Sequence, residues 1–278
     1  MKAAVRFIIA LFATSFLETP PLYATHIPEG WYVGFQGEVS TQRNLNFGLP
    51  VTSIFDQNVV ADLRTLFADY GININRVFVP GRIKYSMGGG FGAQAGYRLC
   101  GFRLEGEITA NYSPYKQLYL NDVLFKRRVQ VTTFPVIGPV ITFPFTMGGS
   151  TWLFGALANL YYDLYFTDDA EWIPYAGLGI GYAYINNQFT LNFIPQTRVR
   201  NTTTPATPTS PFYTLFKYNR SNTVPVAQMI AGLSYQLDDF FSAGLDYRYL
   251  ASSSVDTFTN KRLTLQSINV TFNHWFNC

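Results

Sequence analysis

The fold is decided by the stretch FRLEGEITANY, residues 102–112, in which two kinds of side chain alternate strictly. Phe102 and Leu104 stand at even positions, whereas Glu105 and Glu107 stand at odd positions, and we call these two sets the two parities of the strand. Successive side chains of a β-strand point to opposite faces, so the pattern predicts a strand with one apolar face and one charged face. Because charged groups cannot line a dry sheet core, the charged face must meet water or opposite charges.

Seven further segments alternate in a similar way, so the sequence predicts an all-β protein. The eight predicted strands are 30–40, 90–99, 102–112, 151–163, 172–184, 226–236, 240–250 and 266–276. Eight antiparallel strands can close into an up-and-down barrel whose interior is just wide enough for side chains. Residues 126–147 form either a hairpin above this barrel or a further strand pair, which leaves a barrel of ten strands as an alternative.

The composition excludes several other classes of protein. Only 13% of the residues are charged, against about 25% in soluble domains. The mean hydropathy is only +0.06, and no apolar run of about 18 residues follows residue 24, which excludes transmembrane helices. With 17% aromatic and 48% hydrophobic residues, the chain is too apolar to be disordered. This composition is typical of a transmembrane β-barrel.

The N-terminus has the pattern of a secretory signal. Lys2 and Arg6 provide a positive region, and the apolar stretch 7–17 follows it. About eleven apolar residues are too few to cross a bilayer as a helix. We therefore predict a signal peptide over residues 1–24 and an exported barrel over residues 25–278.

The connections between the predicted strands alternate in length and in charge. The short ones are 100–101, 164–171 and 238–239, and the long ones are 41–86, 113–148, 186–224 and 252–264. The long connections contain fifteen Lys or Arg and only five Asp or Glu, whereas the short ones contain acidic residues and no cation. Short periplasmic turns and long extracellular loops are typical of membrane barrels. Aromatic residues at the strand ends predict interfacial girdles, namely Trp31-Tyr32, Tyr161-Tyr162, Trp172, Phe240-Phe241 and Trp275-Phe276.

Three motifs carry a resemblance to known proteins: GWYVG at 30–34, YAGLGIGY at 175–182 and HWF at 274–276. They resemble the eight-stranded outer-membrane barrels of Gram-negative bacteria, namely the OmpA-like transmembrane domain, the OmpX-type barrels and the opacity-type surface antigens. The resemblance implies an outer-membrane location and names no single function. The chain departs from these families because two residues follow its terminal aromatic residue, and we expect no peptidoglycan-binding domain.

Eight charged residues fall on the inward parity of the predicted strands. They are Glu38, Arg98, Arg103, Glu105, Glu107, Asp163, Asp246 and Arg248. Buried charges are tolerated when they are paired, so we favour a structural salt-bridge network that fills the lumen. The alternative is a gate in which the pairs exchange and let ions pass.

No catalytic or cofactor site is expected. The only histidines are His26 and His274, and neither Asp163 nor Asp246 can be given a nucleophile from the sequence. The glycine-rich runs lack the spacing of nucleotide loops, and glycines at every second position make room inside a narrow barrel instead. We therefore expect no enzymatic activity, cofactor, metal or nucleic-acid partner.

The long loops carry the remaining candidate residues. Lys126, Arg127 and Arg128 are predicted to contact polyanions such as lipid A phosphates or acidic host glycans, the alternative being a solvated surface. Cys100 and Cys278 are expected at the periplasmic rim, either as a disulfide or as free thiols.

Residues 53–70 place apolar side chains at helical spacing, which predicts a short loop helix. From all these features we expect a monomeric outer-membrane protein in contact with lipopolysaccharide, with a structural, surface-antigen or adhesion-type role. The alternative function is a narrow, weakly anion-selective, porin-like channel.

Overall fold

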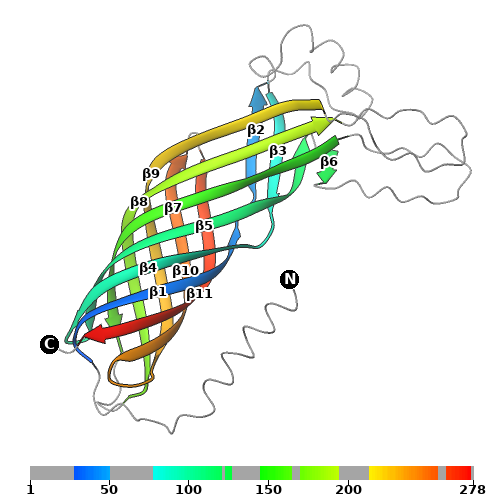
Figure 1. Ribbon diagram of the computed structural model, residues 1–278. Helices are drawn as coiled ribbons and strands as arrows, with labels where there is room; N and C mark the ends of the chain where they lie inside the picture. The colour runs from blue at the N-terminus through cyan, green and yellow to red at the C-terminus, as the bar shows by residue number, and fades with distance from the viewer. Residues whose placement is uncertain are drawn as a thin grey trace, which may run out of the picture.

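The chain forms a closed β-barrel (Figure 1). The computed structural model describes residues 28–50, 78–120, 123–126, 145–164, 170–193, 213–255 and 261–276. The ring consists, in spatial order, of β1 (Gly30–Gln42), β4 (Gly88–Leu99), β5 (Phe102–Leu120), β7 (Phe145–Asp163), β8 (Trp172–Phe193), β9 (Tyr213–Gln236), β10 (Phe241–Val255) and β11 (Lys261–Phe276). Each strand pairs antiparallel with the next, and β11 pairs back onto β1. The prediction of an eight-stranded barrel is confirmed.

Three short strands lie outside the ring, at one end of the barrel. They are β2 (Leu45–Pro50), β3 (Phe78–Tyr85) and β6 (Val123–Lys126). β3 and β6 both pair with the distal part of β5, and β2 pairs with β3. The ten-stranded alternative is wrong, because β5 pairs directly with β7 from Phe102 to Pro114 and leaves no room for an inserted pair.

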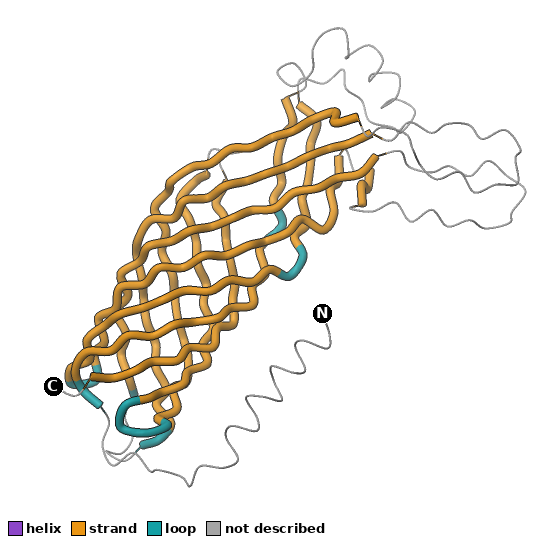
Figure 2. Tube along the Cα trace, in the orientation of Figure 1, coloured by secondary structure: helices purple, strands orange, loops and turns teal. Residues whose placement is uncertain are grey.

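The strands at this end are longer than the sequence predicted. β8 and β9 pair from Trp172 and Tyr235 to Phe193 and Tyr213, with one shift of register between Leu191 and Asn192. The sequence pattern did not predict this continuation because polar and apolar residues exchange faces there. The polar Gln188 faces outward, and the apolar Phe189 faces inward and is buried. Much of the chain expected as loops is therefore a β-extension of the barrel, visible in Figure 2 as strands that continue beyond the ring.

The opposite end of the barrel has tight connections, and we call it the turn end. Between Leu99 and Phe102, Cys100 and Gly101 have φ values of 49° and 83°. Positive φ at both central residues defines a type I′ turn, whose twist matches that of the flanking strands. The end that carries β2, β3 and β6 is called the extended end, and it faces outside by the rule of short periplasmic turns. Among the described residues, no helix is long and apolar enough to cross a membrane.

The outer surface of the ring is an apolar belt. Leu104, Ile108, Leu178 and Ile180 are each more than 60% exposed. None of the exposed side chains in the described part of this belt is charged, whereas the polar residues of the same strands point inward and are buried. A soluble protein could not keep so many apolar side chains in water, but a lipid bilayer accommodates them.

Aromatic rings line both edges of the belt. At the turn end, the ring centroids lie 5.1 Å apart in the pair Trp31–Tyr97 and 4.6 Å apart in the pair Trp172–Tyr235. Towards the extended end, Tyr112 is outward-facing next to a tryptophan, with 4.7 Å between the centroids. Such girdles mark the two membrane–water interfaces.

The predicted girdles are wrong for one member of each of three aromatic pairs. Tyr32, Tyr161 and Trp275 face the lumen and are at most 2% exposed. Their neighbours Tyr162 and Phe276 face outward. Adjacent residues of a strand point to opposite faces, so both rings of such a pair cannot lie in the lipid interface.

Candidate functional site

The lumen is filled by layers of charged and polar side chains. In the layer nearest the turn end, Asp163 of β7 binds both Arg98 of β4 and Arg103 of β5. Arg98 Nη2 lies 2.6 Å from Asp163 Oδ2, and Arg103 Nη2 lies 2.9 Å from Asp163 Oδ1. Both arginines also donate through Nε, so the Arg98 guanidinium binds Oδ2 through two nitrogens and the Arg103 guanidinium binds Oδ1 through two nitrogens.

Aromatic rings complete this layer. The guanidinium carbon of Arg98 lies 5.0 Å from the Trp275 ring centroid. That of Arg103 lies 4.6 Å from the ring centroids of both Tyr161 and Tyr175. Cation–π contacts stabilise a guanidinium that has left water, so the rings support the charges they enclose.

In the middle layer, an ion pair crosses the whole barrel. Arg248 of β10 lies 2.8 Å from Glu107 of β5, between Nη1 and Oε2, and its Nε lies 2.8 Å from Asp246 Oδ1. β5 and β10 are four strands apart in either direction around the ring, so these side chains meet across its full width.

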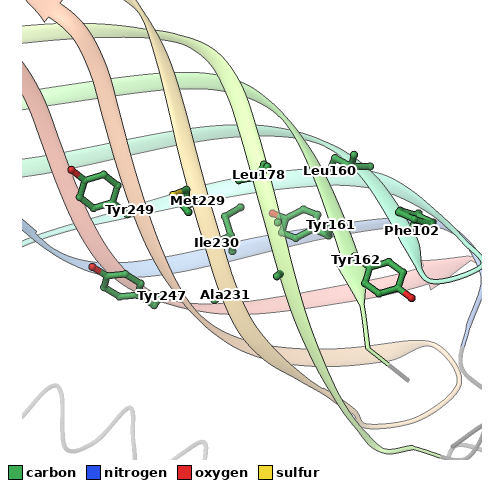
Figure 3. Close-up of a pocket in the computed structure, with 12 residues that line it drawn as sticks. Phe102, Leu160, Tyr161, Tyr162, Leu178, Met229, Ile230, Ala231, Tyr247 and Tyr249 are labelled. Atoms are coloured by element: carbon green, nitrogen blue, oxygen red, sulfur yellow. The ribbon is translucent and has the colours of Figure 1, made fainter. Parts of the chain in front are cut away.

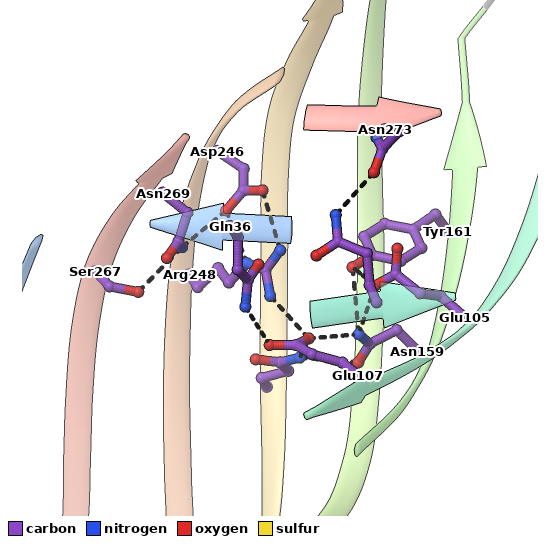
Figure 4. Close-up of polar contacts among 12 residues, drawn as sticks. Gln36, Glu105, Glu107, Asn159, Tyr161, Asp246, Arg248, Ser267, Asn269 and Asn273 are labelled. Carbon is purple, nitrogen blue, oxygen red and sulfur yellow. Dashed lines mark hydrogen bonds and ion pairs between the residues drawn. The ribbon is translucent and has the colours of Figure 1, made fainter. Parts of the chain in front are cut away.

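Neutral donors surround the carboxylates of the middle layer (Figure 4). Glu107 accepts hydrogen bonds from the amide nitrogens of Gln36 at 2.7 Å, Asn159 at 2.7 Å and Gln228 at 3.0 Å. Asp246 accepts a hydrogen bond from Asn269 Nδ2 at 2.9 Å. The Tyr175 hydroxyl also donates to Asp246 Oδ2 at 3.0 Å, so donors from five further strands fix the two acidic side chains.

Glu105 is held without an ion pair among the described residues. It accepts hydrogen bonds from the hydroxyls of Tyr32 and Tyr161, each at 2.8 Å, and from Asn159 Nδ2 at 3.1 Å. Glu38 lies further towards the extended end and accepts a hydrogen bond from Asn111 Nδ2 at 2.6 Å. With five carboxylates and three guanidiniums, the lumen has an excess of acidic groups.

Above the charged layers, an aliphatic cluster lines part of the lumen, and the buried polar residues Gln42, Asn111 and Ser252 lie directly opposite members of it. The buried cluster consists of Leu153, Leu157, Ala183, Ile185, Val224, Val226, Leu250, Leu263 and Leu265. Sequence reasoning missed this layer because it considered only the polar residues of the inward parity. Close packing of these aliphatic side chains reduces the space for water or an ion on their side of the lumen.

Inward glycines make space for the long polar side chains. A Cβ at Gly92 would lie 2.7 Å from Gln36 Nε2, and one at Gly179 would collide with Asn159 and lie 2.8 Å from Gln228 Cγ. The glycine runs therefore act as the spacers that the sequence pattern predicts.

Several predicted residues lie elsewhere or cannot be placed. Lys126 ends β6, opposite Gln117 of β5. Arg127, Arg128, Cys278, the predicted helix 53–70 and the predicted signal peptide 1–24 fall outside the described residues.

The remaining chemistry-bearing residues lie outside the lumen. Cys100 is exposed in its turn. His274 faces outward, with its ring centroid 4.7 Å from that of Phe241. In the described part of the chain, no group of three or more His, Cys, Asp or Glu side chains could hold a metal ion.

An apolar groove of about 670 Å³ runs across the outer surface of β7 to β10 (Figure 3). Leu160, Leu178, Met229 and Tyr247 are among its lining residues. Since the groove lies within the outer belt, it belongs to the lipid-facing surface.

Sequence reasoning missed the aromatic members of the lumen network. They are Tyr32, Tyr161, Tyr175 and Trp275. The amides Gln36, Asn159, Gln228 and Asn269 lie on the inward polar face that the alternation assigns to their strands. The aromatic residues occupy inward positions too, but they were assigned to interfacial girdles or left out because large apolar rings are typical of the outer surface.

A closed eight-stranded ring with an apolar belt, aromatic girdles and a packed polar lumen defines this chain as an outer-membrane β-barrel protein. No protein-family model matches the sequence, and no curated protein matches it.

Solved structures similar to this chain are outer-membrane or bacterial surface proteins. Neisserial surface protein A is 14% identical, with 89% of this chain and 97% of that chain covered and a TM-score of 0.40. Ail, the attachment invasion locus protein of Yersinia pestis, is 10% identical over 89% and 99% of the two chains, with a TM-score of 0.40. OprG from Pseudomonas aeruginosa is 8% identical over 92% and 100%, with a TM-score of 0.47.

Proposed function

We propose that the barrel is a structural scaffold that presents a basic surface for binding acidic glycans or other polyanions outside the cell. The observation that carries this proposal is the charge of the extended end. The described cations at that end are Arg43, Arg82, Lys84, Lys116, Lys126, Lys217, Arg220, Lys261 and Arg262. Among the described residues, the only carboxylate near this end is Glu38, which points into the lumen and binds Asn111.

The binding surface lies on β3, β5 and β6, which we call the platform. Its register places Lys84 opposite Gln117, and Gln117 opposite Lys126, so these three residues form one row across the strands. Arg82 lies opposite Tyr119 in a second row. Neighbouring strands are about 4.8 Å apart, so the Cα atoms of Lys84 and Lys126, two strands apart in one row, are about 10 Å apart.

The platform also offers aromatic and amide groups beside its cations. Lys84 Nζ lies 4.9 Å from the Tyr119 ring centroid, and Tyr119 donates a hydrogen bond to Gln117 Oε1 at 3.2 Å. Repeated cations on a rigid sheet favour a ligand with repeated negative charges, because each added contact needs no further ordering of the protein. Sulfated or phosphorylated glycans have that chemistry.

Binding of heparin and of sucrose octasulfate tests this proposal; the latter is the heparin analogue crystallised with Ail. Two variants of the refolded protein should each bind about tenfold more weakly or worse. The first combines Arg82→Gln with Lys84→Gln, and the second combines Lys126→Gln with Arg127→Gln and Arg128→Gln. Arg43→Gln with Arg262→Gln removes two cations from another part of the extended end and serves as the matched control. Equal weakening by the control, or unchanged binding in the platform variants, would refute the platform as the binding surface.

The second candidate function, an anion-selective channel, is favoured only by the basic extended end. The cross-lumen pair Glu107–Arg248, the aliphatic layer and the excess of lumen carboxylates weigh against it. Single-channel recordings of protein that shows a heat-modifiable gel shift should therefore remain silent. Discrete anion-selective steps would instead make the lumen arginines a gate.

We also propose that the protein acts as a monomer. The ring closes within one chain through the pairing of β1 with β11, so no second copy is needed to complete the wall. Sedimentation of the protein in detergent should give the mass of one chain with its bound detergent.

A further inference from the structure

Two arginines lie together on the outer surface of the seam between β1 and β11, just beyond the apolar belt. The last apolar row of this seam is formed by Val39 and Ile268, which are 53% and 57% exposed. Beyond this row, the backbone hydrogen bonds between β1 and β11 continue towards the extended end. The last of them joins Arg43 N to Thr264 O at 3.3 Å. Arg262 lies two residues from Thr264 on the same strand and has the same outward parity. The two arginines are thus diagonal neighbours, about 7–8 Å apart at their Cα atoms.

Both arginines are exposed, and neither forms an ion pair with another described residue. The residues that separate them from the belt, Thr41, Thr264 and Gln266, are polar and uncharged. This part of the seam therefore has concentrated positive charge that the described part of the protein does not neutralise. Two guanidiniums at this spacing suit a phosphate group, which each can grip through paired N–H donors.

The height of the pair relates it to the membrane. Arg43 lies four residues beyond Val39, which corresponds to about 13 Å along the strand. With a strand tilt of about 40°, its Cα is roughly 10 Å above the hydrocarbon edge. The headgroup layer is about 5–8 Å thick on each side of a bilayer, and arginine side chains reach back towards it. The guanidiniums can therefore lie at the level of outer-leaflet phosphates.

Two outward cations as diagonal neighbours so close to the apolar belt are found on this seam and not on the pair β8 and β9. At a comparable height on β8, the outward residues are Asn186 and Gln188, and on β9 they are Ser221 and Thr223. These residues can contact sugars or water, but they carry no charge to recognise a phosphate. A general attraction to the membrane surface would not require both arginines on neighbouring strands.

We propose that Arg43 and Arg262 form a binding site for the phosphate of an outer-leaflet phosphoglycolipid. The site is separate from the platform and does not depend on its function. It would fix one lipid beside the β1–β11 seam, where the chain closes its own ring, and would hold the two arginines against the membrane surface.

The test compares the lipids that the refolded protein retains on extraction from vesicles. The vesicles consist of phosphatidylcholine with either bisphosphorylated lipid A or the same lipid without phosphates, and retained lipid is counted by mass spectrometry. The wild-type protein should retain the phosphorylated lipid preferentially. Arg43→Gln with Arg262→Gln should reduce that retention by about tenfold or more. Lys217→Gln with Arg220→Gln, the matched control on β9, removes two cations outside both proposed surfaces and should leave it unchanged.

Three outcomes would overturn the site. The first is equal retention of the two lipids, and the second is undiminished retention of the phosphorylated lipid in the seam variant. The third is displacement of the lipid by millimolar inorganic phosphate, which would assign the arginines to a soluble phosphate instead. A heat-modifiable gel shift for each variant ensures that only folded protein is compared. Heparin binding by the seam variant provides an independent readout, because it tests the platform and not this site.

Discussion

Glu107 and Arg248 stand on diametrically opposite strands of the ring and meet in its centre, with 2.8 Å between Oε2 and Nη1. Two long side chains therefore span a lumen that eight strands make narrow. The same glutamate accepts donors from β1, β7 and β9, so one carboxylate ties together much of the wall. This arrangement is typical of a packed core and supports the proposal that the outer surface carries the function.

Removing the cation of this pair should destabilise the barrel strongly. Arg248→Met leaves Glu107 and Asp246 buried without a positive partner, and we expect the free energy of unfolding to fall by about 3–5 kcal/mol. Urea unfolding of protein refolded in phospholipid vesicles, followed by tryptophan fluorescence, measures the change. Adding Glu107→Gln should restore part of the loss. A decrease below about 1 kcal/mol would show that the pair is as weak as a surface salt bridge.

The inward glycines should tolerate no side chain. Gly179→Ala would press a methyl group against Asn159 and Gln228, and should cost about 1–3 kcal/mol of unfolding free energy. Gly37→Ala is the matched control, since a Cβ there meets nothing within 4 Å, and should stay within about 0.5 kcal/mol. Equal effects in the two variants would mean that strand propensity decides the result, and not the space in the lumen.

The position of the membrane can be tested along a single strand. Leu178 is 63% exposed near the middle of the belt, so Leu178→Lys should destabilise the refolded protein by about 2–4 kcal/mol. Gln188→Lys on the outward face of β8, beyond the girdle, should change the stability by no more than about 0.5 kcal/mol. If both lysines were tolerated equally, the apolar belt would not be the lipid-facing surface.

The turn at Cys100 and Gly101 should improve with a better turn residue. Cys100 adopts the left-handed conformation, which asparagine tolerates well and β-branched residues do not. Under reducing conditions, Cys100→Asn should maintain or increase the stability, whereas Cys100→Val should lower it by about 1–2 kcal/mol. Thermal unfolding by circular dichroism can rank the three proteins. A Val variant as stable as the wild type would argue against a type I′ turn.

Much of the fold could be predicted from local sequence, because lipid imposes a strict rule on each strand. Alternation in residues 102–112 placed Glu105 and Glu107 inside and Leu104 outside, and the structure agrees. The rule fails at the edge of the membrane. On β8 the parity of polar and apolar residues reverses near Gln188, so sequence reasoning ended the strand too early and assigned its continuation to a loop.

The sequence by itself determined which face of each alternating segment meets lipid, since this follows from the period of two within a strand. The number of strands needed the structure, because only the direct pairing of β5 with β7 excluded an inserted pair between them. Only the tertiary structure decided which inward side chains meet. Arg248 binds Glu107 on the opposite wall, whereas Glu38 accepts a hydrogen bond from Asn111 two strands away. Ring order and register set these partners, and both depend on the closure of the whole barrel and not on any single segment.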